Sequence, residues 1–159
     1  MELKMVNGMV ALIDGDDFEK VSSFRWRAAT HSRATTYYAQ CTSVGRFRGK
    51  FLHRVIMNAR TGELVDHRNF NGLDCRKENL RKCTPSQSTM NRRKRRICAS
   101  QYKGVYRDKK HWRAVIQVDG KRIQLGEHKT EELAALAYNA AAKVYHGEFA
   151  VLNLTQEQD

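Results

Sequence analysis

The sequence predicts an α+β fold made of two small domains, and three observations lead to this expectation. The 159-residue chain is 41% hydrophobic and contains one proline, which is typical of a folded chain with packed cores. Short runs of alternating apolar and polar residues, separated by turn residues, predict several strands. A single long run near the C-terminus repeats its apolar residues at helical spacing instead. A chain of this length can hold two small domains, and its two parts follow different plans.

The charge balance predicts a polyanionic partner. Lys and Arg outnumber Asp and Glu by 29 to 17, which gives a formal net charge of +12. Such an excess in a short chain favours nucleic acid. Membrane binding would need a basic amphipathic helix or a long apolar run, and the sequence contains neither. Residues 1–8 also lack the apolar core of a signal peptide, so we expect a cytoplasmic protein.

The cysteines do not predict a metal site. The sequence has four cysteines and no CxxC pair among them, whereas the ligands of structural zinc come in close pairs. We therefore expect no structural zinc, and reduced thiols that serve mainly in packing. These thiols belong to Cys41, Cys75, Cys83 and Cys98.

We expect the N-terminal part of the chain, residues 1–57, to be β-rich, with short strands and turns. We call this segment the lead. Residues 9–13 form a compact apolar strand, and the acidic residues 14–17 follow it as a turn. Their spacing matches no EF-hand loop, so we interpret them as a turn with helix-start charge rather than a calcium site. Residues 18–24 then predict one or two helical turns. Further apolar anchors are Trp26 and residues 37–41 and 51–56.

Residues 62–96 predict the order strand, loop, strand, helix. Residues 64–67 form an apolar strand, and the Asn- and Gly-rich residues 68–78 form a loop. Residues 79–83 alternate like a second strand. Thr84 is a natural N-cap and Pro85 a natural first helical residue, so a helix is expected from Pro85 to about Arg96.

This same stretch carries residues suited to phosphodiester cleavage. The carboxylate of Asp66 can hold a hard divalent cation, and the neighbouring imidazole of His67 can take a proton from water. Asn79 follows twelve residues later. On the helix, Ser88 and Asn91 are three residues apart and share a face, so either could point toward Asp66.

His53 stands in the apolar run directly before this stretch. A lone histidine is more often structural than catalytic, and both readings of His53 remain open. The helix itself runs into five consecutive cations, residues 92–96. Such a run is either a solvated linker or a phosphate-binding segment, and its place next to the candidate site favours phosphate contact. The expected contacts are Arg92, Arg93 and Arg95.

The last third of the chain predicts a three-stranded antiparallel sheet packed on one helix. The strands are residues 102–107, 112–118 and 121–126, and Asp119-Gly120 is a strong two-residue hairpin signal. The helix begins after Thr130 as N-cap and ends at Gly147. Its many alanines allow close packing on the apolar face of the sheet.

Alternation sorts the strand residues into two faces. The apolar face carries Trp112, Ala114, Ile116, Ile123 and Leu125. The opposite face is an open one that suits major-groove readout, because Arg reads guanine edges and Gln reads adenine edges. An ordinary solvated sheet face is the alternative, and the basic balance of the chain favours DNA. RNA is disfavoured, since no aromatic-rich stacking face is present. The expected DNA contacts are Lys103, Arg107, Arg113, Gln117, Arg122 and Gln124.

Two sets of short motifs resemble known families. The first set is Leu52-His53-Arg54, Val65-Asp66-His67, Gly72-Leu73-Asp74 and Glu78-Asn79-Leu80-Arg81, with residues 8–14, Trp26 and Tyr38-Ala39 before it. It resembles the HNH homing endonucleases common in bacteriophages. The second set is Tyr102-Lys103-Gly104-Val105, Trp112-Arg113-Ala114, Leu125-Gly126, Ala137-Tyr138 and Ala150-Val151-Leu152-Asn153. It resembles the plant ethylene-response-factor type of DNA-binding domain.

The resemblance implies a ββα-metal nuclease domain at residues 1–98 and a DNA-binding domain at residues 99–156. It implies that Asp66 binds one divalent cation, Mg²⁺ or alternatively Mn²⁺, and that His67 is the general base. Asn79 would tie down the loop and orient that histidine. The partner would be double-stranded DNA, and no small-molecule cofactor is implied. A phage enzyme of this kind would act in the cytoplasm of a bacterial host.

The chain departs from the family pattern at Ser88, where the family has an Asn or His as second protein ligand of the metal. A hydroxyl is a poorer ligand, and Asn91 one turn on could compensate for it. Cys75 also replaces a usual Asn of the loop. Two functions therefore stand open: an active metal-dependent DNA endonuclease that nicks or cuts DNA bound by the C-terminal sheet, and a DNA-binding protein with a degenerate, inactive site.

Overall fold

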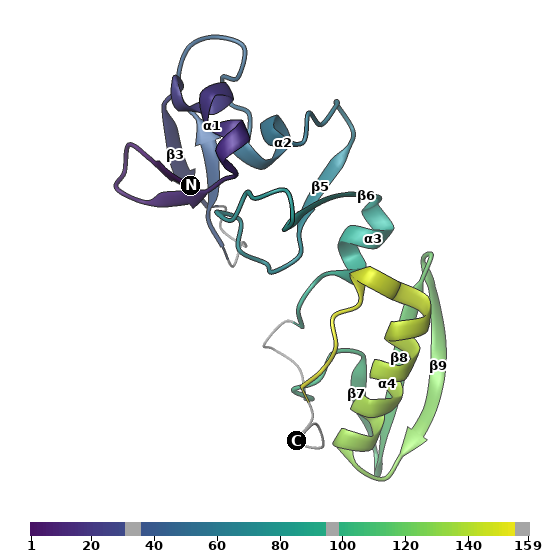
Figure 1. Ribbon diagram of the computed structural model, residues 1–159. Helices are drawn as coiled ribbons and strands as arrows, with labels where there is room; N and C mark the ends of the chain where they lie inside the picture. Colours follow the sequence, from purple (N-terminus) through teal and green to yellow (C-terminus); the bar gives the residue numbers. More distant parts are fainter. Residues whose placement is uncertain (31–35, 95–98, 155–159) are drawn as a thin grey trace. The chain divides into compact units, whose positions relative to one another are not determined.

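The computed structural model of the protein describes residues 1–30, 36–94 and 99–154. It has the α+β fold that the sequence predicts, with small antiparallel sheets and short helices (Figure 1). The chain divides into two compact units, Met1–Thr84 and Pro85–Asp159. The domain limits 1–98 and 99–156 that the resemblance implies stay a prediction.

In its described residues, the first unit has three antiparallel strand pairs and two short helices. Each pair is a two-stranded sheet. The β5–β6 pair contains Asp66 and His67, which the sequence analysis predicts as site residues. The pairs are β1 (Glu2–Lys4) with β2 (Val10–Leu12), β3 (Trp26–Ala29) with β4 (Tyr38–Cys41), and β5 (Leu64–His67) with β6 (Leu80–Cys83). The helices are α1 (Gly15–Ser22) and α2 (Leu52–Ile56).

Both helices correct the sequence-based prediction for the lead. Helix α1 begins at Gly15, three residues earlier than expected, with Asp14 as its N-cap and Asp16 and Asp17 in its first turn, so the expected helix-start charge is confirmed. The Asp17 carboxylate pairs with the Lys77 ammonium at 2.9 Å. Residues 52–56 form a helix rather than a strand or turn. Their buried apolar positions are 52, 55 and 56, which is the spacing of a helix that faces a core.

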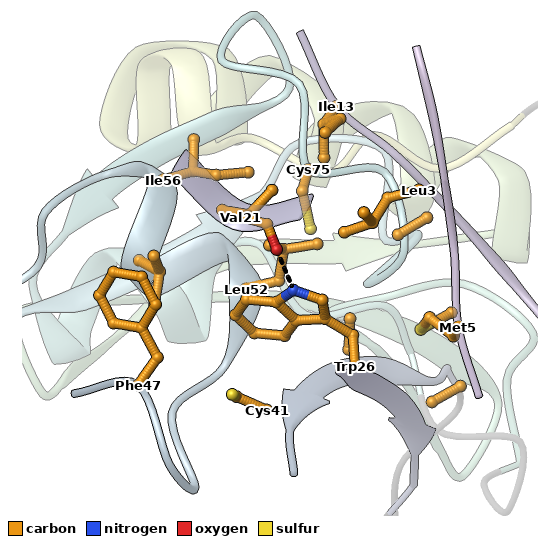
Figure 2. Close-up of a cluster of buried hydrophobic side chains, with 14 of the residues drawn as sticks. Leu3, Met5, Ile13, Val21, Trp26, Cys41, Phe47, Leu52, Ile56 and Cys75 are labelled. Carbon is orange, nitrogen blue, oxygen red and sulfur yellow. Dashed lines mark hydrogen bonds between the residues drawn. The ribbon is translucent and has the colours of Figure 1, made fainter. Parts of the chain in front are cut away.

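The core of the first unit surrounds Trp26, whose side chain is 1% exposed (Figure 2). Its indole N–H donates to the carbonyl of Val21 at 2.9 Å, so the polar atom of this large ring is satisfied. Leu52 and Ile56 bring α2 onto the same core. Cys41 and Cys75 are buried free thiols, as expected of packing residues. Cys83 is half-buried, and Cys98 lies outside the described residues.

The strand, loop and strand predicted around Asp66 are confirmed. Strands β5 and β6 pair so that Asp66 lies opposite Arg81 and His67 opposite Leu80. The predicted helix is α3 (Pro85–Met90), and it ends six residues before Arg96. The prediction of a helix through Arg92, Arg93 and Lys94 is therefore wrong. Consecutive cations repel one another and offer no apolar face to bury, so nothing offsets the cost of extending the helix.

In its described residues, the second unit has a three-stranded antiparallel sheet covered by one long helix, as predicted, and it also includes α3. The strands are β7 (Val105–Asp108), β8 (His111–Val118) and β9 (Lys121–His128), with β8 in the middle. Asp119 and Gly120 both have positive φ, 47° and 79°, as a two-residue hairpin requires. Helix α4 (Glu131–His146) begins at the predicted cap, where the Thr130 hydroxyl accepts the amide of Leu133 at 3.2 Å. The short 3-10 helix η1 (Gly147–Phe149) follows it.

The first strand of this sheet begins at Val105, later than the predicted residue 102. Gly104 precedes it with a φ of 74° and lies directly under the ring of Tyr138 on α4. A β-carbon at this position would lie 2.1 Å from that ring, so the close approach of helix and sheet needs glycine. Strand β9 extends to His128, two residues beyond its predicted end. Within the described residues, none of the helices is both long and apolar enough to cross a membrane.

Candidate active site

Two buried histidines meet in the first unit. His67 is the last residue of β5 and His53 lies on α2, and their side chains are 5% and 8% exposed. Their ring centroids are 4.9 Å apart in an edge-on arrangement. The ring of Tyr38, from β4, lies 5.7 Å from each of them. We call Tyr38, His53 and His67 the histidine cluster, and it joins three elements that are distant in sequence.

Burial keeps both imidazoles neutral. Burial lowers the pKa of His53 to about 3, with further lowering by His67 and Arg54. Burial also lowers the pKa of His67 to about 4, although Asp74 acts in the opposite direction. The unprotonated form that a general base needs is therefore present at neutral pH, while the lowered pKa makes each imidazole a weaker base. The Nδ1 atom of His53 is buried and has no hydrogen-bond partner among the described residues.

Asn79 fastens the loop that follows His67. Its side-chain oxygen accepts the amide of Asn69 at 3.0 Å, and its side-chain nitrogen donates to the carbonyl of Asp74 at 2.7 Å. The amide of Arg68 donates to the main-chain carbonyl of Asn79 at 2.9 Å. These bonds tie together the loop that begins directly after His67, and the orientation of His67 by Asn79 stays a prediction.

Asp74 appears in the sequence analysis as a loop residue and in the motif Gly72-Leu73-Asp74, without a role of its own. Its side chain is 2% exposed and accepts hydrogen bonds from Asn69 at 2.8 Å and from the Arg76 guanidinium at 2.8 Å. The hydrogen bond from Arg76 is the largest cause that lowers the pKa of Asp74. A buried carboxylate with these partners orders the loop. The cluster of Asn, Gly and Asp residues signalled a turn but gave no sign of this burial.

Asp66 lies on β5 opposite Arg81. The Arg81 Nη2 and Asp66 Oδ2 atoms are 3.3 Å apart, and the side chains are 6% and 18% exposed. The Asp66 carboxylate also raises the pKa of the Tyr38 hydroxyl, after burial as the larger cause. Asp66 is therefore within electrostatic reach of the histidine cluster.

The donor chemistry at Asp66 fits a hard divalent cation. Mg²⁺ is commonly held by one or two carboxylates while waters and substrate phosphates complete its shell, so one partly exposed carboxylate is a sufficient protein anchor. Within the part of the chain that the structure describes, no three His, Cys, Asp or Glu side chains gather as a metal site. A cation bound at Asp66 would therefore take its remaining ligands from other groups, such as waters and substrate phosphates.

The other predicted ligands lie at α3, in the second unit. Ser88 is half-buried on this helix, and Asn91 directly follows it and is 5% exposed. The Asn91 amide donates to the carbonyl of Gln87 at 3.1 Å, which continues the helical turn. Arg92 and Arg93 are exposed beyond the helix, and the predicted contact Arg95 lies outside the described residues. Metal binding by Ser88 or Asn91 stays a prediction.

The polar sheet face of the second unit is exposed as predicted, but its cations are not equivalent. The Arg113 guanidinium forms ion pairs with Asp108 at 2.9 Å and with Glu127 at 2.7 Å. These two carboxylates offset its charge. The side chains of Gln117, Arg122 and Gln124 are exposed.

The two predicted contacts around β7 have partners within the protein. The Lys103 ammonium donates to the carbonyl of Met90, and burial lowers the pKa of Lys103 to about 8. The Arg107 guanidinium lies 4.9 Å from the centre of the Trp112 ring. Sequence reasoning missed Tyr106, which is 47% exposed. The alternation after the buried Val105 could have placed Tyr106 on the polar face. It helps to line a shallow hollow with Asp108, Arg113, Val115, Arg122 and Gln124.

Similarity to one curated protein supports the assignment of nuclease activity. The chain is 27% identical over 150 residues to an uncharacterized HNH endonuclease of Acanthamoeba polyphaga mimivirus. The aligned region covers 92% of this chain and 75% of that protein, so the similarity extends over both units. No family model and no solved structure matches the chain.

Proposed function

We propose that this protein is a metal-dependent DNA endonuclease of the HNH type that hydrolyses phosphodiester bonds. The observation that carries the proposal is the pair of buried, neutral imidazoles beside Asp66, with His67 held at the start of a loop that Asn79 fastens. The similarity to an HNH endonuclease and the net charge of +12 support the same conclusion.

Each residue of the site has a role in this proposal. Asp66 binds the divalent cation, Mg²⁺ or Mn²⁺, which supplies neutralisation of charge at the scissile phosphate and the leaving 3′ oxygen. His67 accepts a proton from the attacking water, because its imidazole is neutral near neutral pH. Asn79 holds the loop after His67. His53 packs edge-on against the His67 ring and limits its rotation.

The remaining predicted contacts belong to the same proposal. Ser88 and Asn91 are the further candidate ligands, and Arg92, Arg93 and Arg95 the candidate phosphate contacts after α3. The exposed face of the second unit binds the DNA target through Gln117, Arg122 and Gln124. The fixed charge of Arg113 contributes less, because Asp108 and Glu127 offset it.

Metal removal tests the proposed activity directly. Supercoiled plasmid incubated with the protein and Mg²⁺ is expected to be converted to open-circular or linear DNA, since the cation must offset charge at the phosphate. The same mixture with a chelator is expected to keep its plasmid supercoiled. Gel electrophoresis measures both outcomes. Equal nicking with Mg²⁺ and with chelator would contradict a metal-dependent site.

Arg122 is the cation of choice for testing the sheet face. Arg122→Ala is expected to weaken binding to duplex DNA by about tenfold, because loss of one Arg contact costs roughly 1–3 kcal/mol. Lys143→Ala is the control, since Lys143 is exposed on α4, the helix that covers the opposite face. Fluorescence anisotropy with a labelled duplex measures both. Equal affinities of the two variants would show that DNA does not contact this face.

One observation favours the alternative of a DNA-binding protein with an inactive site. The Asp66 carboxylate is paired with the Arg81 guanidinium, a cation that competes with a metal for the same oxygen. Tight binding of the plasmid without nicking under Mg²⁺ or Mn²⁺ would establish this alternative.

A further inference from the structure

The lead of the chain contains a long segment without carboxylates. Residues 20–62 include no Asp or Glu and contain nine Lys or Arg residues. The predicted DNA contacts lie elsewhere, in residues 92–95 and in the second unit. This segment instead supplies β3, β4 and α2, two of which contribute to the histidine cluster.

Five cations of this segment project into solvent. Within the described residues, no carboxylate forms an ion pair with any of the five. We call them the basic hairpin surface, and they are Arg25, Arg27, Arg46, Arg48 and Lys50. Exposed cations of one sign repel one another, and an anion bound at this surface would offset that repulsion.

Hydrogen bonds hold the segments that carry these cations together. Arg27 on β3 lies opposite Gln40 on β4, and the Gln40 side chain donates to the carbonyl of Gly49 at 3.0 Å. The amide of Cys41 donates to the carbonyl of Lys50 at 2.9 Å, and the amide of Thr42 donates to that of Arg25 at 2.8 Å. The loop of residues 45–50 is therefore fixed against the hairpin.

A buried side chain also anchors the loop of residues 45–50 to the core. Phe47 is 9% exposed and belongs to the core of the unit, and its ring packs 4.8 Å from that of Phe24. Its neighbours Arg46 and Arg48 are exposed. The Arg46 guanidinium lies 4.4 Å from the centre of the Phe47 ring, so the buried ring helps to hold this cation in place.

The basic hairpin surface is continuous with the histidine cluster. Tyr38 and Gln40 are two residues apart on β4, so they lie on the same face, about 7 Å from each other. The Tyr38 ring contacts both histidines, and Arg27 is the cross-strand partner of Gln40. On the other side, Phe51 directly follows Lys50 and stacks on His53 with ring centroids 5.8 Å apart.

We propose that the basic hairpin surface binds the sugar-phosphate backbone of duplex DNA next to the bond held at the histidine cluster. This inference rests on the proposed function and assigns the nuclease unit its own DNA contact, separate from the sheet of the second unit. Duplex DNA carries one negative charge per about 1.7 Å of axis, so it can contact several fixed cations at once. A single small anion can contact only one or two of them. Phosphate contacts of this kind set position and carry no sequence information.

Salt dependence of DNA binding tests the proposal. The triple variant Arg27→Gln, Arg48→Gln, Lys50→Gln is compared with a control triple in exposed cations elsewhere, Lys4→Gln, Arg60→Gln, Lys143→Gln. Anisotropy with a labelled duplex is measured in chelator at several salt concentrations. The slope of log K against log salt is negative, and each lost phosphate contact makes it shallower by about 0.9. The first triple should therefore reduce the magnitude of the slope by about 2–3. The control should keep the wild-type slope.

Equal slopes for the two triples would overturn the proposal. Loss of binding to anionic lipid vesicles in the first triple, with DNA slopes unchanged, would overturn it in favour of a membrane surface. The binding assay needs no cleavage, so it is independent of the plasmid assay. If the wild-type protein nicks no plasmid but the two triples differ in slope, the proposed activity is contradicted and the DNA-binding role of the basic hairpin surface stands. If the wild-type protein nicks plasmid but the two triples have equal slopes, only the DNA-binding role of this surface is contradicted. Thermal unfolding by circular dichroism confirms that both triples are folded.

Discussion

His67→Ala is expected to lower the rate of metal-dependent plasmid nicking by about 10²–10⁴-fold, the usual contribution of a general base. The imidazole of His67 is buried and neutral, and alanine removes the group that this proposal assigns to accept the proton from water. Binding of duplex DNA should change little, since the side chain is only 5% exposed. Single-turnover nicking rates and anisotropy measure the two effects separately.

Two further variants make this result specific. His67→Asn keeps a polar side chain of similar shape in the buried site but cannot act as a base, so it should be as inactive as His67→Ala. His111→Ala is the matched control, because His111 is exposed at the start of β8. Activity of His67→Asn close to that of the wild type would exclude His67 as the base.

Gly104→Ala is expected to unfold the second unit or to destabilise it by about 3 kcal/mol or more. The added β-carbon would lie 2.1 Å from the Tyr138 ring and 2.6 Å from the carbonyl oxygen of Val115. The φ of 74° adds the penalty of a left-handed conformation. Neither the helix nor the central strand can shift without opening the core between them. Urea unfolding followed by circular dichroism measures the loss of stability.

Gly120→Ala separates steric overlap from backbone strain. Gly120 has a similar φ of 79°, but no atom lies within 4 Å of the β-carbon that alanine would add. Its cost should stay near 1–2 kcal/mol, the penalty of the left-handed conformation alone. Hydrogen exchange read by mass spectrometry should place the extra exchange of Gly104→Ala in residues 102–154. Equal destabilisation by the two variants would show that the contact with Tyr138 contributes nothing.

Local signals made much of the fold predictable. The Asp119-Gly120 pair determines its own turn, and Thr130 caps α4 as expected, because both effects act within a few residues. The alternation in β8 and β9 placed Ala114 and Ile116 against the helix and Arg122 in solvent. The β5–loop–β6 order around Asp66 and His67 followed in the same way.

The predictions failed where a local pattern competes with tertiary burial. Residues 52–56 lie in a region predicted to consist mainly of short strands and turns, and they form a helix because the core of the first unit accepts positions 52, 55 and 56 together. The helix predicted to reach Arg96 stops at Met90, since its last predicted turns have no apolar face to bury.

The sequence by itself determined the identity of the candidate site residues, the turn and cap positions, and the basic charge of the chain. Only the tertiary structure decided which of these groups meet. It brings His53 on α2 against His67 on β5, places the Arg113 charge between Asp108 and Glu127, and pairs Arg27 across the strands with Gln40, two residues along β4 from Tyr38. The reason is that side-chain type and periodicity act over a few residues, whereas burial, pKa and charge pairing depend on packing between segments that are distant in the chain.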